Sequence, residues 1–330
     1  MTGIRSLTLP AAATAAALLL SACGSPAPAG GTASGAPAKG FPVTQTNCGV
    51  KTTYQRPPQR AVSMNQHTTE IMLALGLQKS MVGTAYLDDK ILPGYRDAYR
   101  GIKVLADEYP SYETVLAAEP DFVYGGFNSA FHEDGRSRAA LKKAGIASRL
   151  NIEDCADGPV TMTTMAKEIR EVAEVFGVRE RGERELKKLN GTLKSVAAKV
   201  DGVKPTRVFV YDSGDKTAFT AGGAGVGNDM IKRAGGVNLF ADLDKSFGDV
   251  SFEQVAERAP EVIVIYDYGD QPVADKKKFL LANPALKDVP AIKHKRFAVL
   301  PLSSTLLGVR APAGVESLAR QLHPGRFDGE

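Results

Sequence analysis

The chain has 330 residues, of which 43% are hydrophobic, and this is enough to build one or two packed domains. Its formal net charge is +4 and its basic residues are dispersed, so nothing in the composition points to a nucleic-acid-binding protein. The four His residues are not spaced as a closed metal cluster, and we predict no metal site.

Residues 1–23 have the features of a signal peptide. Arg5 supplies a positive start, and the apolar run over residues 7–20 is too short to span a bilayer as a helix. The run ends in Leu-Ser-Ala-Cys, which resembles the bacterial lipobox, so we expect a lipid on Cys23. An ordinary signal peptide with an incidental Cys is the alternative. Residues 24–41 are rich in Gly, Ala, Pro and Ser, and we expect a disordered tether at the extracytoplasmic face of the cell membrane.

Two further cysteines, Cys48 and Cys155, follow the tether. In an exported and oxidising setting the natural expectation is one disulfide between them. Two separately buried thiols are the alternative.

The N-lobe, residues 42–178, shows short apolar runs alternating with helical patterns. We predict strands at 60–65, 81–84, 104–105, 122–124 and 147–150, with helices at 70–75 and 137–144 between them. This alternation indicates an α/β fold with a mainly parallel sheet, and ligands of such sheets bind beyond the carboxyl ends of the strands. The polar and aromatic residues at those ends include Asp88, Asp89, Glu108, Phe131 and His132. From the same set we expect ligand contacts from Asn65, Gln66, His67, Tyr86, Tyr109, Tyr112, Phe127 and Asn128.

Two amphipathic helices follow, at 162–175 and 179–200. The second is long enough to run about 30 Å. We expect it to join two lobes as a stiff connection, although either helix could instead be a surface helix of one lobe.

The C-lobe, residues 201–330, repeats the pattern with strands at 207–211, 262–265 and 297–300 and a last helix at 314–322. A glycine-rich loop at 220–228 lacks the last glycine of a dinucleotide-binding motif, so we expect it to line a cleft. Arg310 is the best-placed cation for an anionic ligand, with a surface salt bridge as the equally expected alternative. The ligand contacts predicted in this lobe are Tyr211, Gly222, Gly223, Tyr266, Tyr268 and Arg310.

A short pattern occurs once in each lobe. Residues 111–115 and 251–255 both read Ser, an aromatic residue and Glu, then Val two residues on, and both precede Pro, an acidic residue and a strand. The two copies are 140 residues apart (253 minus 113), about the size of a small domain. Glu113 and Glu253 thus lie at the first turns of matched helices. They either cap those helices only or form a pair of docking groups.

Catalytic patterns are missing from the sequence. There is no Gly-x-Ser-x-Gly elbow and no Cys-His pair near a plausible nucleophile. The adjacent Asp88 and Asp89 are poor candidates for a paired-acid mechanism. We therefore predict a binding protein with no catalytic residue and no cofactor, and keep a surface-tethered enzyme or redox protein as the second class.

Residues 42–324 resemble the substrate-binding lipoproteins of bacterial ABC importers for iron-siderophores, haem and cobalamin. The resemblance lies in the lipobox, in the opening unit at 60–76, in the two Glu-containing segments with residues 119–123, and in the loop at 221–223 leading to 234–238. It implies two Rossmann-like lobes joined by one long helix. It also implies that Glu113 and Glu253 dock an ABC permease that works with its ATPase.

The resemblance implies a large ligand, often a metal chelate, held between the lobes. Iron chelates are frequent ligands of the family that this chain resembles, so we expect an iron-siderophore or another iron chelate. Haem, cobalamin and a deazaflavin precursor remain alternatives. The only membrane contact that we expect is through the N-terminal lipid.

Overall fold

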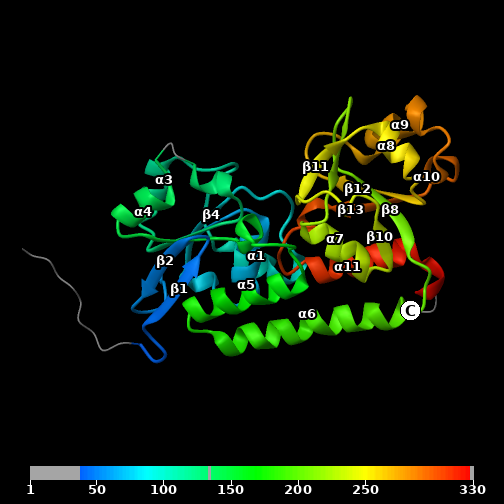
Figure 1. Cartoon of the computed structure of the whole chain (residues 1–330). Coiled ribbons are helices and arrows are strands. Elements are labelled where there is room, and N and C mark those ends of the chain that lie inside the picture. Colours follow the sequence, from blue (N-terminus) through cyan, green and yellow to red (C-terminus); the bar gives the residue numbers. More distant parts are fainter. Residues whose placement is uncertain (1–37, 133–134, 328–330) are drawn as a thin grey trace, which may run out of the picture. The chain divides into compact units, whose positions relative to one another are not determined.

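Two parallel β-sheets, each covered by helices, form the framework of the protein (Figure 1). The computed structural model describes residues 38–132 and 135–327. The predicted signal peptide, the lipid site Cys23 and tether residues 24–37 lie outside the described residues. Within the part that is described, no helix combines the length and the apolar character needed to cross a membrane.

The N-lobe contains a five-stranded parallel sheet with the strand order β5-β4-β3-β6-β7. Its strands are β3 (Ala61–Met64), β4 (Met81–Ala85), β5 (Val104–Ala106), β6 (Phe122–Gly125) and β7 (Ala147–Leu150). Its helices are α1 (Gln66–Ala74), α2 (Arg96–Arg100), α3 (Tyr112–Ala117), α4 (Arg138–Lys143) and α5 (Met162–Val175). All five predicted strands are present, with borders that shift by one or two residues.

The strands of this sheet are apolar on both faces because helices cover both. Successive side chains of a strand point to opposite faces. Phe122 and Tyr124 of β6 accordingly pack in one core with α1 and α5, while Val123 packs in a second core with Val115 of α3 and Leu141 of α4. This two-sided burial accounts for the continuous apolar runs in the sequence.

The C-lobe has a four-stranded parallel sheet with the order β10-β8-β12-β13. Its strands are β8 (Thr206–Tyr211), β10 (Gly236–Asn238), β12 (Val262–Asp267) and β13 (Phe297–Pro301). Its helices are α7 (Val226–Arg233), α8 (Phe252–Glu257), α9 (Val273–Ala282), α10 (Pro290–Lys293) and α11 (Ala311–Leu322). The two-lobe α/β fold with mainly parallel sheets is therefore confirmed.

The repeated segments occupy equivalent places in the two sheets. The Arg60 side chain, next to β3, donates to the carbonyl oxygen of Ala118 just after α3, at 2.8 Å. In the C-lobe, the Arg207 side chain on β8 donates to the carbonyl oxygen of Arg258, just after α8. Residue 258 lies 140 positions after residue 118 (258 minus 118), which is the spacing of the sequence repeat. The repeat thus reflects a structural unit of strand, helix and strand.

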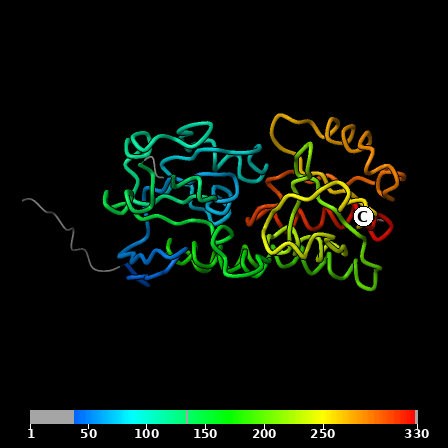
Figure 2. The backbone as a smooth tube through the Cα atoms, turned by 45° about the horizontal axis from the view of Figure 1, so that its top comes forward, coloured from blue at the N-terminus to red at the C-terminus, as the bar shows by residue number. Residues whose placement is uncertain are grey.

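Helix α6 (Arg179–Lys199) packs against α5 at one end and against α11 and α7 at the other (Figure 1 and Figure 2). Its buried face consists of Gly182, Leu186, Leu189, Leu193 and Val196. The predicted long helix is present, and it contacts helices of both lobes. The lobe borders at 178 and 201 remain predictions, because residues 37–330 form one compact unit.

Two antiparallel strand pairs were not predicted. The first is a hairpin of β1 (Val43–Asn47) and β2 (Val50–Tyr54), and the second pairs β9 (Ala218–Ala221) with β11 (Phe247–Val250). The hairpin turns at Cys48 and Gly49, which both have positive φ (48° and 77°). A two-residue turn with positive φ at both positions matches the twist of the strands that it connects.

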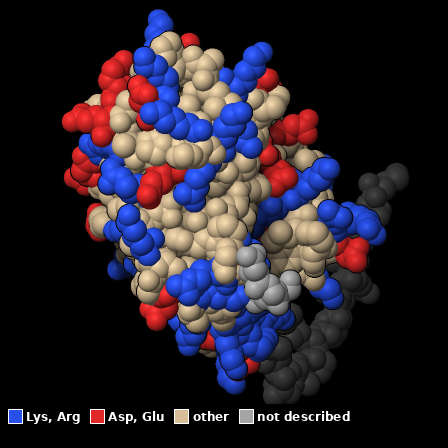
Figure 3. Space-filling view, turned by 90° about the vertical axis from the view of Figure 1, so that its right-hand side faces the viewer, with Lys and Arg blue, Asp and Glu red and all other residues tan. Residues whose placement is uncertain are grey.

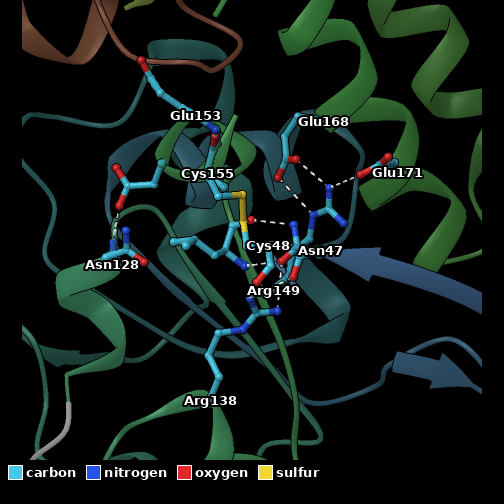
Figure 4. Close-up of a disulfide and its surroundings, with 12 residues drawn as sticks. Asn47, Cys48, Asn128, Arg138, Arg149, Glu153, Cys155, Glu168 and Glu171 are labelled. Atoms are coloured by element: carbon cyan, nitrogen blue, oxygen red, sulfur yellow. Dashed lines mark hydrogen bonds and ion pairs between the residues drawn. A yellow bond between two sulfur atoms is a disulfide. The ribbon is translucent and has the colours of Figure 1, made fainter. Parts of the chain in front are cut away.

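The predicted disulfide between Cys48 and Cys155 is present, with the two Cα atoms 5.5 Å apart (Figure 4). It ties the hairpin to the segment after β7. Close by, the buried Arg149 of β7 donates to both carboxylate oxygens of Glu168 on α5, at 3.0 and 2.6 Å, and to Glu171 at 2.7 Å. These contacts hold α5 on the sheet, because a charge-assisted bidentate pair fixes both distance and orientation.

Candidate functional site: a cleft between two lobes

An aromatic pair stands at the carboxyl ends of the N-lobe strands. The rings of Tyr86, after β4, and Tyr109, after β5, are stacked with centroids 4.5 Å apart. Asn65, directly after β3, donates from Nδ2 to the Tyr109 hydroxyl at 2.9 Å, and that hydroxyl lies 3.0 Å from Ser129 Oγ. Both tyrosines are partly exposed, whereas Asn65 is fully buried. Tyr86 and Tyr109 are therefore available to a ligand, and Asn65 positions the Tyr109 hydroxyl.

The backbone at these strand ends is unusual. Asn65 and Tyr86 have φ values of 85° and 55°. Residues other than Gly rarely adopt such values, and they persist only where the surroundings enforce them. The Asn65 side chain helps to enforce its own conformation, because its Oδ1 accepts a hydrogen bond from the Gly126 amide at 3.1 Å.

Two predicted ligand contacts, Gln66 and His67, support the site without lining it. Gln66 is buried, donates to Glu70 at 3.0 Å and accepts from the Asp89 amide at 3.2 Å. His67 is 2% exposed, and its burial lowers its pKa to about 4, so its ring is neutral at physiological pH. The predicted ligand contacts of these two residues are corrected: both have a structural role, because α1 is buried on all sides at its start.

The remaining predicted N-lobe residues lie further along the same edge. Phe127 packs with its ring 5.1 Å from that of His67 and is partly exposed. Asn128 is exposed, and its backbone amide donates to Asp154. Tyr112 is partly exposed on α3. All three are accessible, and their contact with a ligand remains a prediction.

The C-lobe wall is built around Tyr268, which follows β12 and is partly exposed. Its hydroxyl donates to Asp212 Oδ2 at 3.0 Å. The Lys276 ammonium lies 4.6 Å from the Tyr268 ring centroid and donates to the carbonyl oxygens of Asp212 and Tyr266, both at 2.7 Å. Lys276 is 1% exposed, so its ammonium group interacts with groups inside the C-lobe and not with solvent. Sequence reasoning missed Asp212 and Lys276, since nothing in the pattern of α9 marks one of its lysines as buried.

Tyr211 and Tyr266, both predicted to contact a ligand, are 1% and 2% exposed. The Tyr211 hydroxyl donates to the Gly214 carbonyl oxygen at 2.6 Å, and the Tyr266 ring packs against Phe247. These two predictions are corrected: both rings belong to the hydrophobic core, because each lies within the length of its strand and not beyond its end.

The glycine loop also has a different role from the predicted one. A Cβ on Gly222 would be 2.2 Å from the Lys245 carbonyl oxygen, and one on Gly223 would be 2.1 Å from the Ala241 carbonyl oxygen. Both contacts are with backbone of the same lobe. The glycines are thus explained by the close approach of residues 241–246, and the expectation that they approach a ligand is corrected.

Arg310, predicted to be a cation for an anionic ligand, is 8% exposed and links the two lobes. It precedes α11 in the C-lobe, and its guanidinium donates to both carboxylate oxygens of the fully buried Glu70 at 2.6 Å. It also donates to Asp89 Oδ2 at 3.0 Å, to Ser303 Oγ at 3.0 Å and to the Lys90 carbonyl oxygen at 2.6 Å. All of these partners are protein groups, so the structure corrects the prediction of a cation free for ligand.

A second set of contacts joins the lobes near the disulfide. Asn151 Nδ2 donates to the Leu307 carbonyl oxygen at 3.1 Å, and Glu153 accepts from the Leu307 amide at 2.8 Å. Burial raises the pKa of Glu153 to about 7. The C-lobe segment 303–310 is thus held against the N-lobe at two places.

A cavity of about 280 Å³ lies between the lobes above these contacts. The N-lobe contributes residues 88 and 89, and the C-lobe contributes the ends of β12 and β13. The lining consists of Asp88, Asp89, Asp267, Tyr268, Gly269, Pro301, Leu302 and Ser303. Larger hollows exist around residues 39–41 with the start of α6, beside the disulfide, along β2 and between α5 and α6, but none of these four is lined by residues of both sheets. We take the interlobe cavity as the candidate ligand site, because both sheets end at it.

Glu113 and Glu253 are both exposed, at the first turns of α3 and α8. Each follows a Ser whose hydroxyl accepts a hydrogen bond from the third backbone amide beyond it. Hydrogen bonds from its own amide and from the capping Ser lower the pKa of each carboxyl. Both helices lie on the side of the molecule opposite α6 (Figure 1). The two groups therefore form matched, charged and accessible positions, and their docking role remains a proposal.

No cluster of three or more metal-ligating His, Cys, Asp or Glu side chains occurs within residues 38–132 and 135–327.

Comparisons with known proteins agree with this architecture. The chain is 27% identical to an uncharacterized ABC transporter substrate-binding lipoprotein of Bacillus subtilis over 94% of this chain and 95% of that protein. It is 24% identical to a vitamin B12-binding protein of Vibrio parahaemolyticus over 63% of this chain and 70% of that protein. A solved periplasmic binding protein from Veillonella parvula superposes with a TM-score of 0.79 at 31% identity, covering 86% of this chain and 97% of that one.

Residues 62–303, well over half of the chain, match the periplasmic binding protein family. Members of this family bind small ligands and work with a permease and an ATPase. The chain therefore belongs to this family and is the substrate-binding protein of an ABC transporter, not an enzyme.

Proposed function

We propose that this protein captures an iron-siderophore or a similar metal chelate in the interlobe cavity and delivers it to an ABC permease. The observation that carries the proposal is the convergence of both sheets on one cavity, which is lined by Tyr268, by Ser303 and by carboxylates of both lobes. An aromatic ring beside a few placed hydroxyl and carboxylate groups suits a ligand of mixed polarity. Lipid on Cys23 would keep the protein at the extracytoplasmic face of the membrane.

The ligand is tested by thermal unfolding against ferric siderophores, haem, cobalamin and deazaflavins. A ligand that binds the folded state stabilises it by RT ln(1 + [L]/Kd), so the melting temperature should rise with the concentration of a ferric siderophore. If the melting temperature moves only with cobalamin, the iron proposal fails. Cobalamin is the second candidate, because one relative is a vitamin B12-binding protein.

We propose further that Glu113 and Glu253 dock the permease. In cells that depend on this transporter, the variant with Glu113→Ala and Glu253→Ala should lose uptake while the purified protein keeps its ligand affinity. The matched control changes two other exposed carboxylates near the same helices, Glu119 and Glu257, to Ala and should leave uptake intact. Weaker ligand binding in the first variant would place these carboxylates in the ligand site and contradict the docking role.

Membrane attachment has its own test. The Cys23→Ala variant should move from the membrane fraction to the soluble extracytoplasmic fraction. A variant that stays in the membrane fraction would show that attachment does not need the lipid.

A further inference from the structure

The charges that line the interlobe cavity restrict the ligand further. Resting on the function proposed above, we propose that the chelate carried by this protein is uncharged or cationic, and that the cavity discriminates against anionic chelates.

Three of the eight lining residues are aspartates, Asp88, Asp89 and Asp267, and all three are exposed. The lining includes no Lys or Arg. Partial desolvation, together with the smaller effect of the neighbouring Asp89 charge, raises the pKa of the Asp88 carboxyl. An anionic ligand entering here would add to this repulsion, whereas a cation would relieve it.

The nearest guanidinium cannot compensate for these carboxylates. Arg310 contacts Asp89, but its remaining hydrogen bonds go to Glu70, Ser303 and the Lys90 carbonyl oxygen. One positive charge thus faces two carboxylates, Glu70 and Asp89, and the group retains a net charge of −1 (one minus two). To bind an anion, Arg310 would have to leave Glu70 as a buried, unpaired charge, which is strongly unfavourable.

Two nearby lysines, Lys276 and Lys90, do not make the net charge around the cavity positive. Lys276 on the C-lobe side is buried under the Tyr268 ring and donates to two backbone carbonyl oxygens. Lys90 is exposed, next to the two aspartates of its loop, and is not part of the lining. Counting Lys90 and Arg310 against Glu70, Asp88, Asp89 and Asp267 leaves a net charge of −2 (two minus four).

The acidic lining is a local property of the cavity. The whole chain has a net charge of +4, with 41 Lys and Arg residues. Figure 3 shows many of these basic side chains on one outer side of the molecule. Lys277, Lys278, Lys293 and Lys295 of the C-lobe all lie outside the cavity lining. Basic residues are thus abundant elsewhere, and a cavity for an anionic ligand would be expected to use some of them.

The test compares three forms of one chelate that differ in a single substituent. A ferric linear trihydroxamate with a free terminal ammonium carries one positive charge, its N-acetyl derivative is neutral, and its N-succinyl derivative carries one negative charge. We expect the affinity of the purified protein, measured by tyrosine fluorescence, to fall in that order. The difference between the first and the last should be about tenfold or more at low ionic strength and should shrink as salt is added.

A charge-neutralising variant assigns the effect to the cavity. Changing Asp88→Asn and Asp267→Asn together should remove most of the difference between the cationic and anionic forms, because each lost carboxylate charge both weakens the attraction of the cation and relieves the repulsion of the anion. Asp97→Asn, at an exposed position on α2 outside the lining, is the matched control and should leave the difference unchanged. The salt dependence of the unmodified protein gives a second measurement, in case the double variant is unstable.

The outcomes separate this inference from the proposed function. If the succinylated form, or a trianionic ferric tris-catecholate, binds as tightly as the cationic form or more tightly, the charge inference is overturned and the iron-chelate function stands. A variant that leaves the difference unchanged also overturns the assignment to the cavity. If no ferric chelate of any charge binds, the proposed function and this inference fail together.

Discussion

Removing the positive charge of Arg310 is expected to destabilise the protein severely. Arg310→Met keeps most of the aliphatic volume but leaves Glu70, which is fully buried, without its cationic partner. Removing one partner of a buried ion pair costs about 3–5 kcal/mol, because the remaining charge is neither hydrated nor paired. Glu70 keeps hydrogen bonds from Gln66 and from the Leu92 amide, at 3.0 and 2.9 Å, but both donors are neutral.

The measurement is urea-induced unfolding at neutral pH, with the slope m followed as well as the midpoint, so that a change of stability is separated from a change of mechanism. A second variant, Glu70→Gln, and the combination of both complete a double-mutant cycle. The combination should cost much less than the sum of the single changes, because it leaves no unpaired buried charge. The coupling should reach several kcal/mol.

An exposed ion pair provides the matched control. Arg170 and Glu183 are 2.7 Å apart with side chains 53% and 58% exposed, so Arg170→Met should cost less than about 1 kcal/mol. If Arg310→Met costs no more than this control, or if the two changes of the cycle simply add, the interlobe ion pair does not have the energetic role that its burial indicates.

Three further predictions concern stability. Replacing both Cys48 and Cys155 by Ser should lower the free energy of unfolding by about 4–5 kcal/mol in the chain-entropy model, as the disulfide closes a loop of 107 residues; an unfolding curve like that of the unmodified protein would contradict this. The pKa of Glu153 rises from 4.5 in the unfolded chain to about 7 in the folded protein, so folding favours its protonated form and its contribution to the free energy of unfolding should fall as the pH rises from about 4.5 to 7. Glu153→Gln should remove this pH dependence of the free energy of unfolding, and an unchanged pH dependence would show that other groups cause it. In α6, Gly191→Ala should stabilise the protein by about 0.5–1 kcal/mol, because no atom lies within 4 Å of the new Cβ. Gly182→Ala should destabilise the protein, because its Cβ would lie 2.8 Å from a side chain of α5, and equal effects at both sites would refute the packing of α6 on α5.

The parallel sheets and the long helix could be predicted because their signals are local and strong. Runs such as 122–124 and 262–265 are apolar on both faces, and this pattern is produced by helices on both sides of a sheet. The repeat around Glu113 and Glu253 was visible because each copy keeps its capping Ser, a residue that is needed for a local hydrogen bond. The hairpin at 43–54 was missed because its strands are short and half-exposed, so they carry a weak hydrophobic pattern.

Only part of the candidate site could be predicted from the sequence. Residue order and periodicity were sufficient to place Tyr86, Tyr109 and Tyr268 at strand ends, because the end of an apolar run marks the end of a strand. They could not show that Tyr266 is buried while Tyr268, two positions on, is partly exposed, since that depends on how far other segments extend over the strand. Nor could they show that Arg310 would meet Glu70, 240 residues earlier. Which charges neutralise one another and which remain to face a ligand is set by contacts between distant segments, and such contacts leave no periodic trace in the chain.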